Sequence, residues 1–422
     1  MQNDINTGGH TQWFYFRVSN TFKGQKVKFN ICNYSKPDNL FNYGMKVSVL
    51  SEKRQKEDGT NWHRAGENIS YFKNGILKTP NSYGPQYYTL TFTYTFNYDK
   101  DTLFFAYSVP YSYSDLRNDL TLIESNQERA AVMQRKVLCQ TLAGEDCEIL
   151  TITSKEKLEN YENRKAVVFS ARVHPGETVG SWMMRGLLMF LTDPDNKEAK
   201  LLRENFIFKV IPMLNPDGVI NGNYRCSLAG CDLNRRWKNP SKIIHPIVYQ
   251  VKRLIAKLHE ERQILMFCDL HGHSRKQNVF MYGCDNLKKP QASRIFPLML
   301  SKLNPYFSFE SSRFNLHKSK EATARIAIYK DLNGTVPLIY TLESSFAGVD
   351  MGKDKGKHLS TAMLESLGRD LARTILIHQK IHVPQEIAKS FRPQKPKTDK
   401  QFSEDQSSQE EDEEVDLTSK LL

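Results

Sequence analysis

The sequence lacks the features that direct a chain out of the cell or into a membrane. No apolar run approaches the roughly 18 residues that a membrane span needs. The opening MQNDINTGGH has neither the basic start nor the apolar stretch of a secretory signal. Cysteine is scarce and odd in number, with seven residues scattered over 422, which argues against a disulfide framework. These absences predict a reducing, cytoplasmic setting.

Negative charge is concentrated at the end of the chain and is outnumbered elsewhere. Residues 403–422 carry eight acids and one base, a net of −7, so the formal charge of +12 for the whole chain becomes +19 on residues 1–402. Such a body attracts polyanions, which include nucleic acid, anionic membranes and acidic protein tails. Charge alone does not choose among them, and the sequence shows no nucleic-acid-binding motif.

The first part of the chain has the composition of β structure. Turn-forming clusters separate five segments that are rich in aromatic and β-branched residues, at 11–20, 26–34, 45–50, 87–98 and 102–109. Because no helical period appears there, we predict a small antiparallel β-sandwich domain over residues 1–125. The pattern at its end, 112–136, favours one helix with Ser114 or Asp115 as its cap.

From about residue 137 short apolar runs alternate with helical stretches, which is typical of an α/β/α domain with a mixed, largely parallel sheet. The predicted strands are 148–153, 165–173, 205–214, 263–270 and 336–344, and the clearest helices are 181–193, 245–261 and 361–379. This second domain is expected over 126–383. Residues 384–422 are too polar and proline-rich to pack, so we expect a disordered tail.

Three of the predicted strands end in residues that bind metals or transfer protons. One ends at His174 with Glu177 just beyond, one ends at His271, and one ends at Glu343. Ligands bind at the carboxyl ends of strands in open α/β sheets, so these four side chains are placed to meet. Two imidazoles and one carboxylate form a known catalytic zinc site. The remaining carboxylate is free to transfer protons.

Each of these residues also has a simpler interpretation. His-x-x-Glu is common by chance, His174 could be a loop residue, and Glu177 could be favoured at a helix N-terminus by its charge alone. His273 competes with His271 because alternation along a strand points both side chains the same way. Asn234 and Arg235 suit the capture of a carboxylate, but a surface salt bridge would also explain the arginine.

Several segments resemble one known family. They are HTQWFYFRVSN, VPYSYSDL, HPGET, NPDGV with GNYRCSLAGCDLNRRW, DLHGHS, FMYGCD and YTLESSF. Together they resemble the zinc metallocarboxypeptidase fold, and specifically the cytosolic carboxypeptidases, which are tubulin deglutamylases. The resemblance covers nearly everything except the tail. It implies one Zn²⁺ per chain, bound by His174, Glu177 and His271, with Glu343 as the catalytic acid and base.

The same resemblance implies how substrate is bound. Asn234 and Arg235 match the pair that holds the terminal carboxylate, and Arg225 matches the arginine that stabilises the oxyanion. Gly176 stands where digestive carboxypeptidases have an arginine, as in the cytosolic family. An acidic substrate side chain needs a cation in its pocket, and residues 317–332 supply candidates: Lys318, Lys320, Arg325 and Lys330. Arg325 is preferred, since KEATAR resembles a pocket-lining segment of that family and arginine grips carboxylates in a bidentate manner.

We therefore expect a zinc carboxypeptidase that removes glutamates from C-terminal tails or polyglutamate side chains of acidic proteins such as tubulin. The expected setting is cytoplasmic, at microtubules or cilia, with a monomeric chain and no nucleic-acid or membrane partner. Two alternatives stay open: an aspartoacylase-like zinc amidohydrolase and a non-catalytic microtubule-binding module. Relatives would have further sheet-forming chain before 11–20, so we expect either a shortened sequence or a sandwich that lacks an edge strand.

Overall fold

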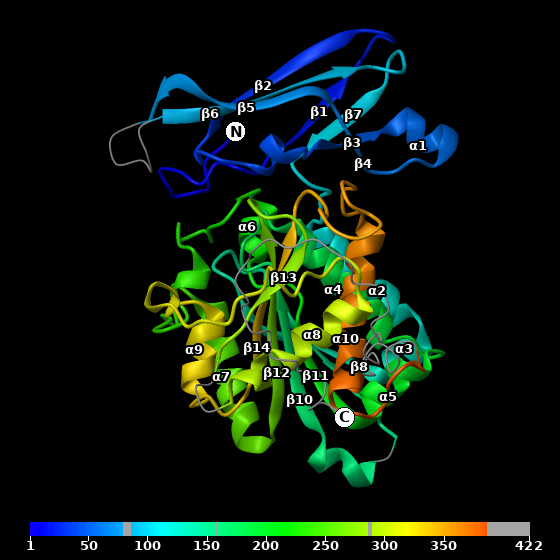
Figure 1. Ribbon diagram of the computed structural model, residues 1–422, viewed down its shortest axis with the longest axis vertical. Coiled ribbons are helices and arrows are strands. Elements are labelled where there is room, and N and C mark those ends of the chain that lie inside the picture. Colours follow the sequence, from blue (N-terminus) through cyan, green and yellow to red (C-terminus); the bar gives the residue numbers. More distant parts are fainter. Residues whose placement is uncertain (79–85, 157, 286–288, 386–422) are drawn as a thin grey trace, which may run out of the picture.

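The structure is a computed structural model that describes residues 1–78, 86–156, 158–285 and 289–385. An N-terminal part that contains β1 to β7 lies across one end of a larger α/β part (Figure 1). The tail predicted at 384–422 lies outside the described residues except for its first two. No helix in the described ranges is long and apolar enough to cross a membrane.

Two antiparallel sheets form the N-terminal part. One has the order β1 (Tyr15–Ser19), β7 (Thr102–Ala106), β3 (Val47–Ser51) and β4 (His63–Ala65), and the other has the order β2 (Lys26–Tyr34), β6 (Gln86–Thr95) and β5 (Glu67–Leu77). Phe29 and Phe92 from the second sheet stack at 5.1 Å, and Phe105 from the first lies 5.1 Å from Phe29. These rings fill the space between the sheets, and such aromatic pairs stabilise a core beyond their buried area.

Three elements of this part do not follow from the sequence pattern. Strands β4 and β5 were not expected, because β5 is an edge strand that buries only Tyr71 and therefore shows no apolar alternation. Helix α1 (Glu52–Asp58) was not expected either, and its last residues lie in the turn-forming cluster at 56–61. Ser51 caps its first turn through Arg54 N–H, and Gly59 ends it at φ 75°, a conformation that glycine adopts without strain.

The expected single helix over 112–136 is wrong in both its cap and its length. Helix α2 (Tyr113–Ser125) is capped by Ser112, whose hydroxyl accepts from Asp115 N–H while the Asp115 side chain accepts from Ser112 N–H. Asn126 then adopts an extended conformation and caps the short α3 (Gln127–Val132). The last residues of the expected helix begin β8 (Met133–Gln140), which pairs antiparallel with β9.

The α/β part is built on one seven-stranded sheet with the order β13-β14-β12-β10-β11-β9-β8. Its remaining strands are β9 (Asp146–Ile152), β10 (Lys165–Ala171), β11 (Phe206–Ile211), β12 (Ile264–His273), β13 (Val279–Tyr282) and β14 (Leu338–Ser345). The central strands β14, β12, β10 and β11 are parallel, whereas β13, β9 and β8 are antiparallel to their neighbours. This confirms the predicted mixed sheet with a parallel centre.

Helices cover both faces of this sheet. The α-helices are α4 (Thr178–Leu191), α5 (Lys197–Asn205), α6 (Pro216–Ile220), α7 (Pro246–Glu261), α8 (Ile295–Leu303), α9 (Ala324–Asp331) and α10 (Thr361–His378). The 3-10 helices are η1 (Leu40–Tyr43), η2 (Leu158–Asn163), η3 (Leu233–Arg235), η4 (Pro290–Ser293) and η5 (Lys318–Lys320). Val167 packs in the core beneath α4 and α10, and its neighbour Val168 packs in the opposite core beneath α7 and α9. The central strands are apolar on both faces for this reason, and the predicted α/β/α layers are confirmed.

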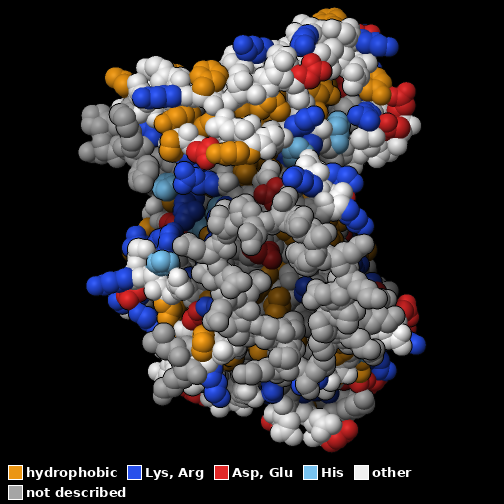
Figure 2. Space-filling model, viewed as in Figure 1, with side chains coloured by type: hydrophobic (Ala, Val, Ile, Leu, Met, Phe, Trp, Pro, Cys, Tyr) orange, Lys and Arg blue, Asp and Glu red, His pale blue; other side chains and the backbone are white. Residues whose placement is uncertain are grey.

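The carboxyl ends of the central strands face the N-terminal part. Ser274, next to the end of β12, accepts a hydrogen bond from Lys36 at 2.9 Å, and Thr178, at the start of α4, bonds to Ser108 at 2.8 Å. Figure 2 shows Lys, Arg and His side chains on both rims of this junction. The β-sandwich therefore covers the edge of the sheet at which ligands usually bind.

Candidate functional site

His174 and Glu177 lie in the loop after β10, and Arg172 shapes this loop. Arg172 has a left-handed backbone, φ 58°, which costs a non-glycine residue about 1–2 kcal/mol. Its guanidinium donates twice to the Pro175 carbonyl, at 3.0 and 2.7 Å, and once to Ser181 Oγ at 2.7 Å. These charge-assisted bonds offset the strain and hold the loop against the start of α4.

The NPDG segment, residues 215–218, supports the same loop from below. Asn215 donates through Nδ2 to the Val173 carbonyl at 3.2 Å, and its Oδ1 accepts from Gly218 N–H at 3.1 Å. A Cβ atom on Gly218 would lie 2.3 Å from Cγ of Pro175. The NPDG segment therefore supports the loop that carries His174 and Glu177 (the histidine loop), and its glycine allows the close approach.

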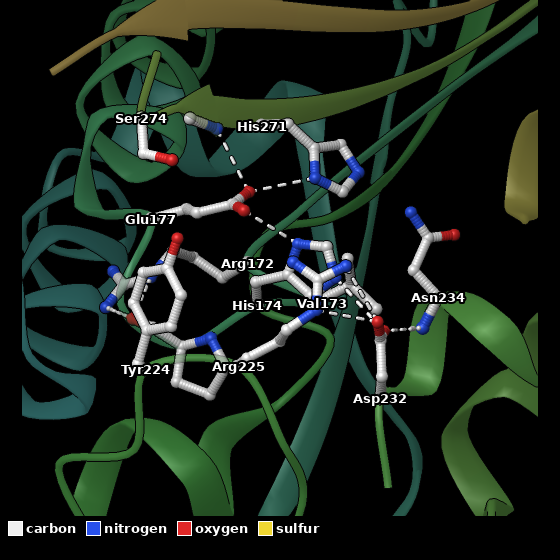
Figure 3. A network of polar contacts seen from close by, with 12 residues as sticks. Arg172, Val173, His174, Glu177, Tyr224, Arg225, Asp232, Asn234, His271 and Ser274 are labelled. Atoms are coloured by element: carbon white, nitrogen blue, oxygen red, sulfur yellow. Dashed lines mark hydrogen bonds and ion pairs between the residues drawn. The ribbon is translucent and has the colours of Figure 1, made fainter. Parts of the chain in front are cut away.

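Three buried side chains converge at the end of β12 (Figure 3). Nδ1 of His174 lies 2.7 Å from one oxygen of Glu177, and Nδ1 of His271 lies 2.9 Å from the other. One ligand atom from each of the three residues lies within 4.8 Å of the others. Gly272 N–H donates to Glu177 at 3.0 Å. Burial opposes the charge of Glu177, but the two imidazoles outweigh it, so its pKa lies well below the ordinary value.

Carboxylates behind the two imidazoles fix their orientation. Nε2 of His174 lies 3.1 Å from Asp232, and Nε2 of His271 lies 2.6 Å from Asp269, which also accepts from Ser170 Oγ at 2.7 Å. With a metal ion bound at the centre, each Nε2 would donate its proton to the carboxylate behind it, and each Nδ1 would be the ligand atom. This carboxylate–histidine arrangement is the usual setting of zinc ligands, so the donor set fits the metal.

His273, which the sequence could not separate from His271, is engaged elsewhere. Its Nδ1 accepts from the backbone N–H groups of Arg275, at 3.3 Å, and Lys276, at 3.0 Å. Its ring packs edge-on against Phe280 at 5.3 Å. Burial, and then the charge of Lys276, lower its pKa to about 4. The structure therefore places His271 in the three-residue centre and leaves His273 beside it.

Glu343 lies on β14, directly across from His271 on β12 in the register of the two strands. Its carboxylate lines the cavity and makes no hydrogen bond to any residue that the structure describes. Burial raises the pKa of Glu343 to about 7, against the opposing effect of His271. A carboxyl group without a hydrogen-bond partner and with a pKa near neutrality suits general acid–base chemistry.

Arg225 reaches the same centre from a loop that the N-terminus holds in place. Its guanidinium pairs with Asp232 at 2.7 Å. The carboxylate of Asp4 accepts from the backbone N–H groups of Tyr224 (2.6 Å), Arg225 (2.7 Å) and Cys226 (2.7 Å). Asp4 is only 3% exposed. Its role could not be predicted, because the partners are about 220 residues apart in sequence.

The residues expected to bind substrate line the same cavity, which measures about 490 Å³. Asn234 Oδ1 accepts from Ala324 N–H at 2.9 Å, which leaves the Nδ2 group without a described partner. Within the described residues, the Arg235 guanidinium donates only to the Asn234 carbonyl, at 2.8 Å. Arg325 is buried, and its Nη1 donates to the Gly283 carbonyl and to Cys284 Sγ, so its Nε and Nη2 groups have no partner among the described residues.

The structure separates the four cations that were considered for the acidic side chain. Arg325 and Lys320 line the cavity, whereas Lys318 and Lys330 do not. Lys330 pairs instead with Glu321 at 2.7 Å on the surface. Arg325 is the more buried of the two that remain.

Comparisons with known proteins agree with this geometry. Residues 121–342 match the family model of the zinc carboxypeptidases. The chain is 45% identical to cytosolic carboxypeptidase 3 of Mus musculus over 380 residues, which are 88% of this chain and 37% of that relative. It is 45% identical to cytosolic carboxypeptidase 2 of Danio rerio over 381 residues, 89% of this chain and 52% of that relative. The chain thus spans between 37% and 52% of the length of these two curated relatives.

Solved structures share the fold. A metallo-carboxypeptidase from Burkholderia cenocepacia superposes with a TM-score of 0.71 at 22% identity, covering 90% of this chain and 91% of that one. A metallo-carboxypeptidase from Pseudomonas aeruginosa, in complex with (2-guanidinoethylmercapto)succinic acid, gives 0.70 at 22% identity, covering 90% and 92%. The family model supports the expectation of zinc, and it covers more than half of the sequence. The chain belongs to the zinc carboxypeptidase family, and its sequence is similar to those of the cytosolic carboxypeptidases.

Proposed function

We propose that this chain is a zinc-dependent carboxypeptidase that removes glutamates from C-terminal tails or polyglutamate side chains of acidic proteins such as tubulin. The observation that carries the acidic preference is the charge of the cavity. Seven Lys or Arg side chains line it, against the carboxylates of Glu177 and Glu343. Glu177 belongs to the three-residue centre, so the carboxylates that line the cavity do not balance its cations.

Ion pairing within the described residues supports this reasoning. Arg225 has an acidic partner, Asp232. No described carboxylate lies within ion-pair distance of the other six, which are Lys36, Arg235, Arg275, Arg313, Lys320 and Arg325. Unpaired charges in a recess are unfavourable, and an acidic peptide supplies the missing partners. The proposal implies that the chain acts in the cytoplasm and associates with microtubules through their acidic tails.

The catalytic roles follow from position. His174, Glu177 and His271 would hold zinc, which supplies a Lewis acid and lowers the pKa of a water molecule towards about 7. Glu343 takes a proton from the attacking water and returns it to the departing amine. Arg225 donates to the carbonyl oxygen as negative charge develops there, a contribution of a few kcal/mol.

Two further residues make the reaction an exopeptidase reaction. Asn234, through its free Nδ2 group, and Arg235 bind the terminal carboxylate of the substrate. Arg325 faces the side chain of the terminal residue and favours an acidic one. A substrate without a free carboxylate at this position leaves buried donors unpaired, and such a loss discriminates strongly.

The test is mass spectrometry of synthetic peptides that end in Glu, Gln or Lys, incubated with the zinc-loaded chain and with Glu343→Gln as the matched control. We expect release of the terminal Glu, slower release of Gln and Lys, and no release by the control. Peptide binding without release would support the non-catalytic module. Hydrolysis of N-acetylaspartate in preference to the peptides would support the amidohydrolase.

A further inference from the structure

The β-sandwich contributes one side chain to the cavity of the α/β part. Lys36 follows β2, and its ammonium donates to Tyr224 Oη at 3.0 Å and to Ser274 Oγ at 2.9 Å. It also lies 5.0 Å from the centre of the Tyr224 ring. Both acceptors are neutral hydroxyls, and no carboxylate among the described residues is within ion-pair distance. Lys36 is therefore a cation in the cavity wall without an anionic partner.

Its neighbours place Lys36 beside the three-residue centre. Tyr224 packs on the histidine loop, because its carbonyl accepts from Gly176 N–H at 2.8 Å and a Cβ on Gly176 would lie 2.7 Å from its ring. Figure 3 shows Tyr224 and Ser274 on one side of His174 and Glu177, and Asn234 on the other. The terminal carboxylate is assigned to the Asn234 side, so the chain before the scissile bond lies on the Lys36 side.

The electrostatic setting of Lys36 favours an anion. Burial, and then the guanidinium of Arg225, lower the Lys36 pKa to about 7, and the more distant charge of Glu177 offsets them only in part. The Lys36 ammonium is thus buried at a point where no described carboxylate is close enough to pair with it. A substrate carboxylate at this point would restore the charge of the ammonium and form a charge-assisted hydrogen bond.

We propose that Lys36 is a substrate-binding residue that takes the side-chain carboxylate of the residue preceding the scissile bond, so that the chain prefers substrates with two consecutive acidic residues. This inference rests on the proposed carboxypeptidase function. It gives the N-terminal part a direct role in specificity, because one wall of the substrate site then belongs to the β-sandwich.

The alternative role of Lys36, a tie between the two parts, is already filled by other contacts. Lys46 N–H donates to His358 Nε2 at 3.0 Å, and Ser108 bonds to Thr178 at 2.8 Å. Arg64 also donates to the Phe346 carbonyl. Because these bonds do not involve Lys36, removing its ammonium should leave the two parts joined.

The experiment compares three peptides that end in Glu-Glu, Gln-Glu or Ala-Glu, cleaved by the zinc-loaded full chain. We expect wild type to favour Glu-Glu over Gln-Glu about tenfold in kcat/KM, the gain typical of a hydrogen bond to a charged group. Lys36→Met should bring this ratio close to one while cleaving Ala-Glu within about twofold of wild type. Lys36→Arg should keep the preference. The matched control is Lys28→Met, because Lys28 is an exposed lysine on β2, the strand that precedes Lys36.

Each other outcome is decisive. If Lys36→Met slows all three peptides equally, its role is structural and the inference is overturned. If wild type cleaves Glu-Glu and Gln-Glu equally well, the inference is overturned even when the variant does not fold. If wild type cleaves none of the peptides, the proposed function itself fails and takes this inference with it.

Discussion

Replacing Asp4 with Ala is expected to lower turnover by loosening the loop that carries Arg225. The Asp4 carboxylate accepts three backbone N–H groups, from residues 224, 225 and 226, at 2.6 to 2.7 Å. Hydrogen bonds to a charged group contribute about 1.5–3 kcal/mol each. Because the three share one carboxylate and are not additive, we expect the free energy of unfolding to fall by about 3–5 kcal/mol.

The effect on catalysis has an upper limit set by Arg225 itself. Loss of one oxyanion donor typically lowers kcat by about 10²–10³. Asp4→Ala keeps Arg225, which is still paired with Asp232 at 2.7 Å, so we expect a smaller loss, about 10- to 100-fold. The zinc content should not change, because Asp4 contacts none of the three converging side chains.

The assay is steady-state hydrolysis of a peptide ending in Glu, with thermal unfolding measured in parallel. Asn6→Ala is the matched control, because it removes a contact from the same segment to Leu228 (2.7 Å) that does not hold Arg225. If Asp4 acts through Arg225, the double variant Asp4→Ala/Arg225→Ala should be no slower than Arg225→Ala alone. Fully multiplicative losses would refute the reasoning.

Three further predictions follow from the site and the junction. His271→Ala should lose stoichiometric zinc and His273→Ala should retain it, because of these two histidines only His271 points its Nδ1 at Glu177. Metal analysis showing the reverse would contradict the ligand set. Arg325→Ala should sharply reduce release of terminal Glu and spare a neutral terminal residue, and cleavage of polyglutamate at the wild-type rate would remove Arg325 from the pocket. His358 accepts from Lys46 N–H across the junction, and burial, then Arg64 and Lys46, lower its pKa to about 4. The unfolded chain, with a histidine pKa near 6.5, therefore binds a proton that the folded chain rejects, and stability should fall as pH drops from about 6.5 to about 4. His358→Gln should remove about 1–2 kcal/mol of this loss, a value discounted because the ring is partly exposed. The measurement is urea unfolding at both pH values. If the free energy of unfolding falls between them by as much in the variant as in wild type, the prediction is wrong.

The sequence predicted what is encoded in local patterns. The central strands are apolar on both faces and appeared as continuous runs, so the parallel centre of the sheet was expected correctly. Strands β5, β8 and β13 lie at sheet edges or next to them, and β5 and β8 alternate irregularly between exposed and partly buried residues. Such segments carry little hydrophobic signal.

The candidate site divides in the same way. The meeting of His174, Glu177, His271 and Glu343 could be expected, because strand ends of a parallel sheet share one edge. Their supports could not, because they depend on contacts over long sequence separations. Asp232 lies 58 residues from His174, and Lys36 reaches Ser274 across 238 residues. One support could have been identified from the sequence. Asp269 lies two residues before His271 on the same predicted strand, so alternation places the two side chains on the same face.

The most direct test of the central claim is mass spectrometry of glutamylated tubulin before and after incubation with the zinc-loaded chain. The account predicts stepwise loss of whole glutamyl residues from tails or side chains with wild type. It predicts no loss with Glu343→Gln, which should still bind zinc and the tails. Tubulin masses that stay unchanged with zinc-loaded wild type would contradict it.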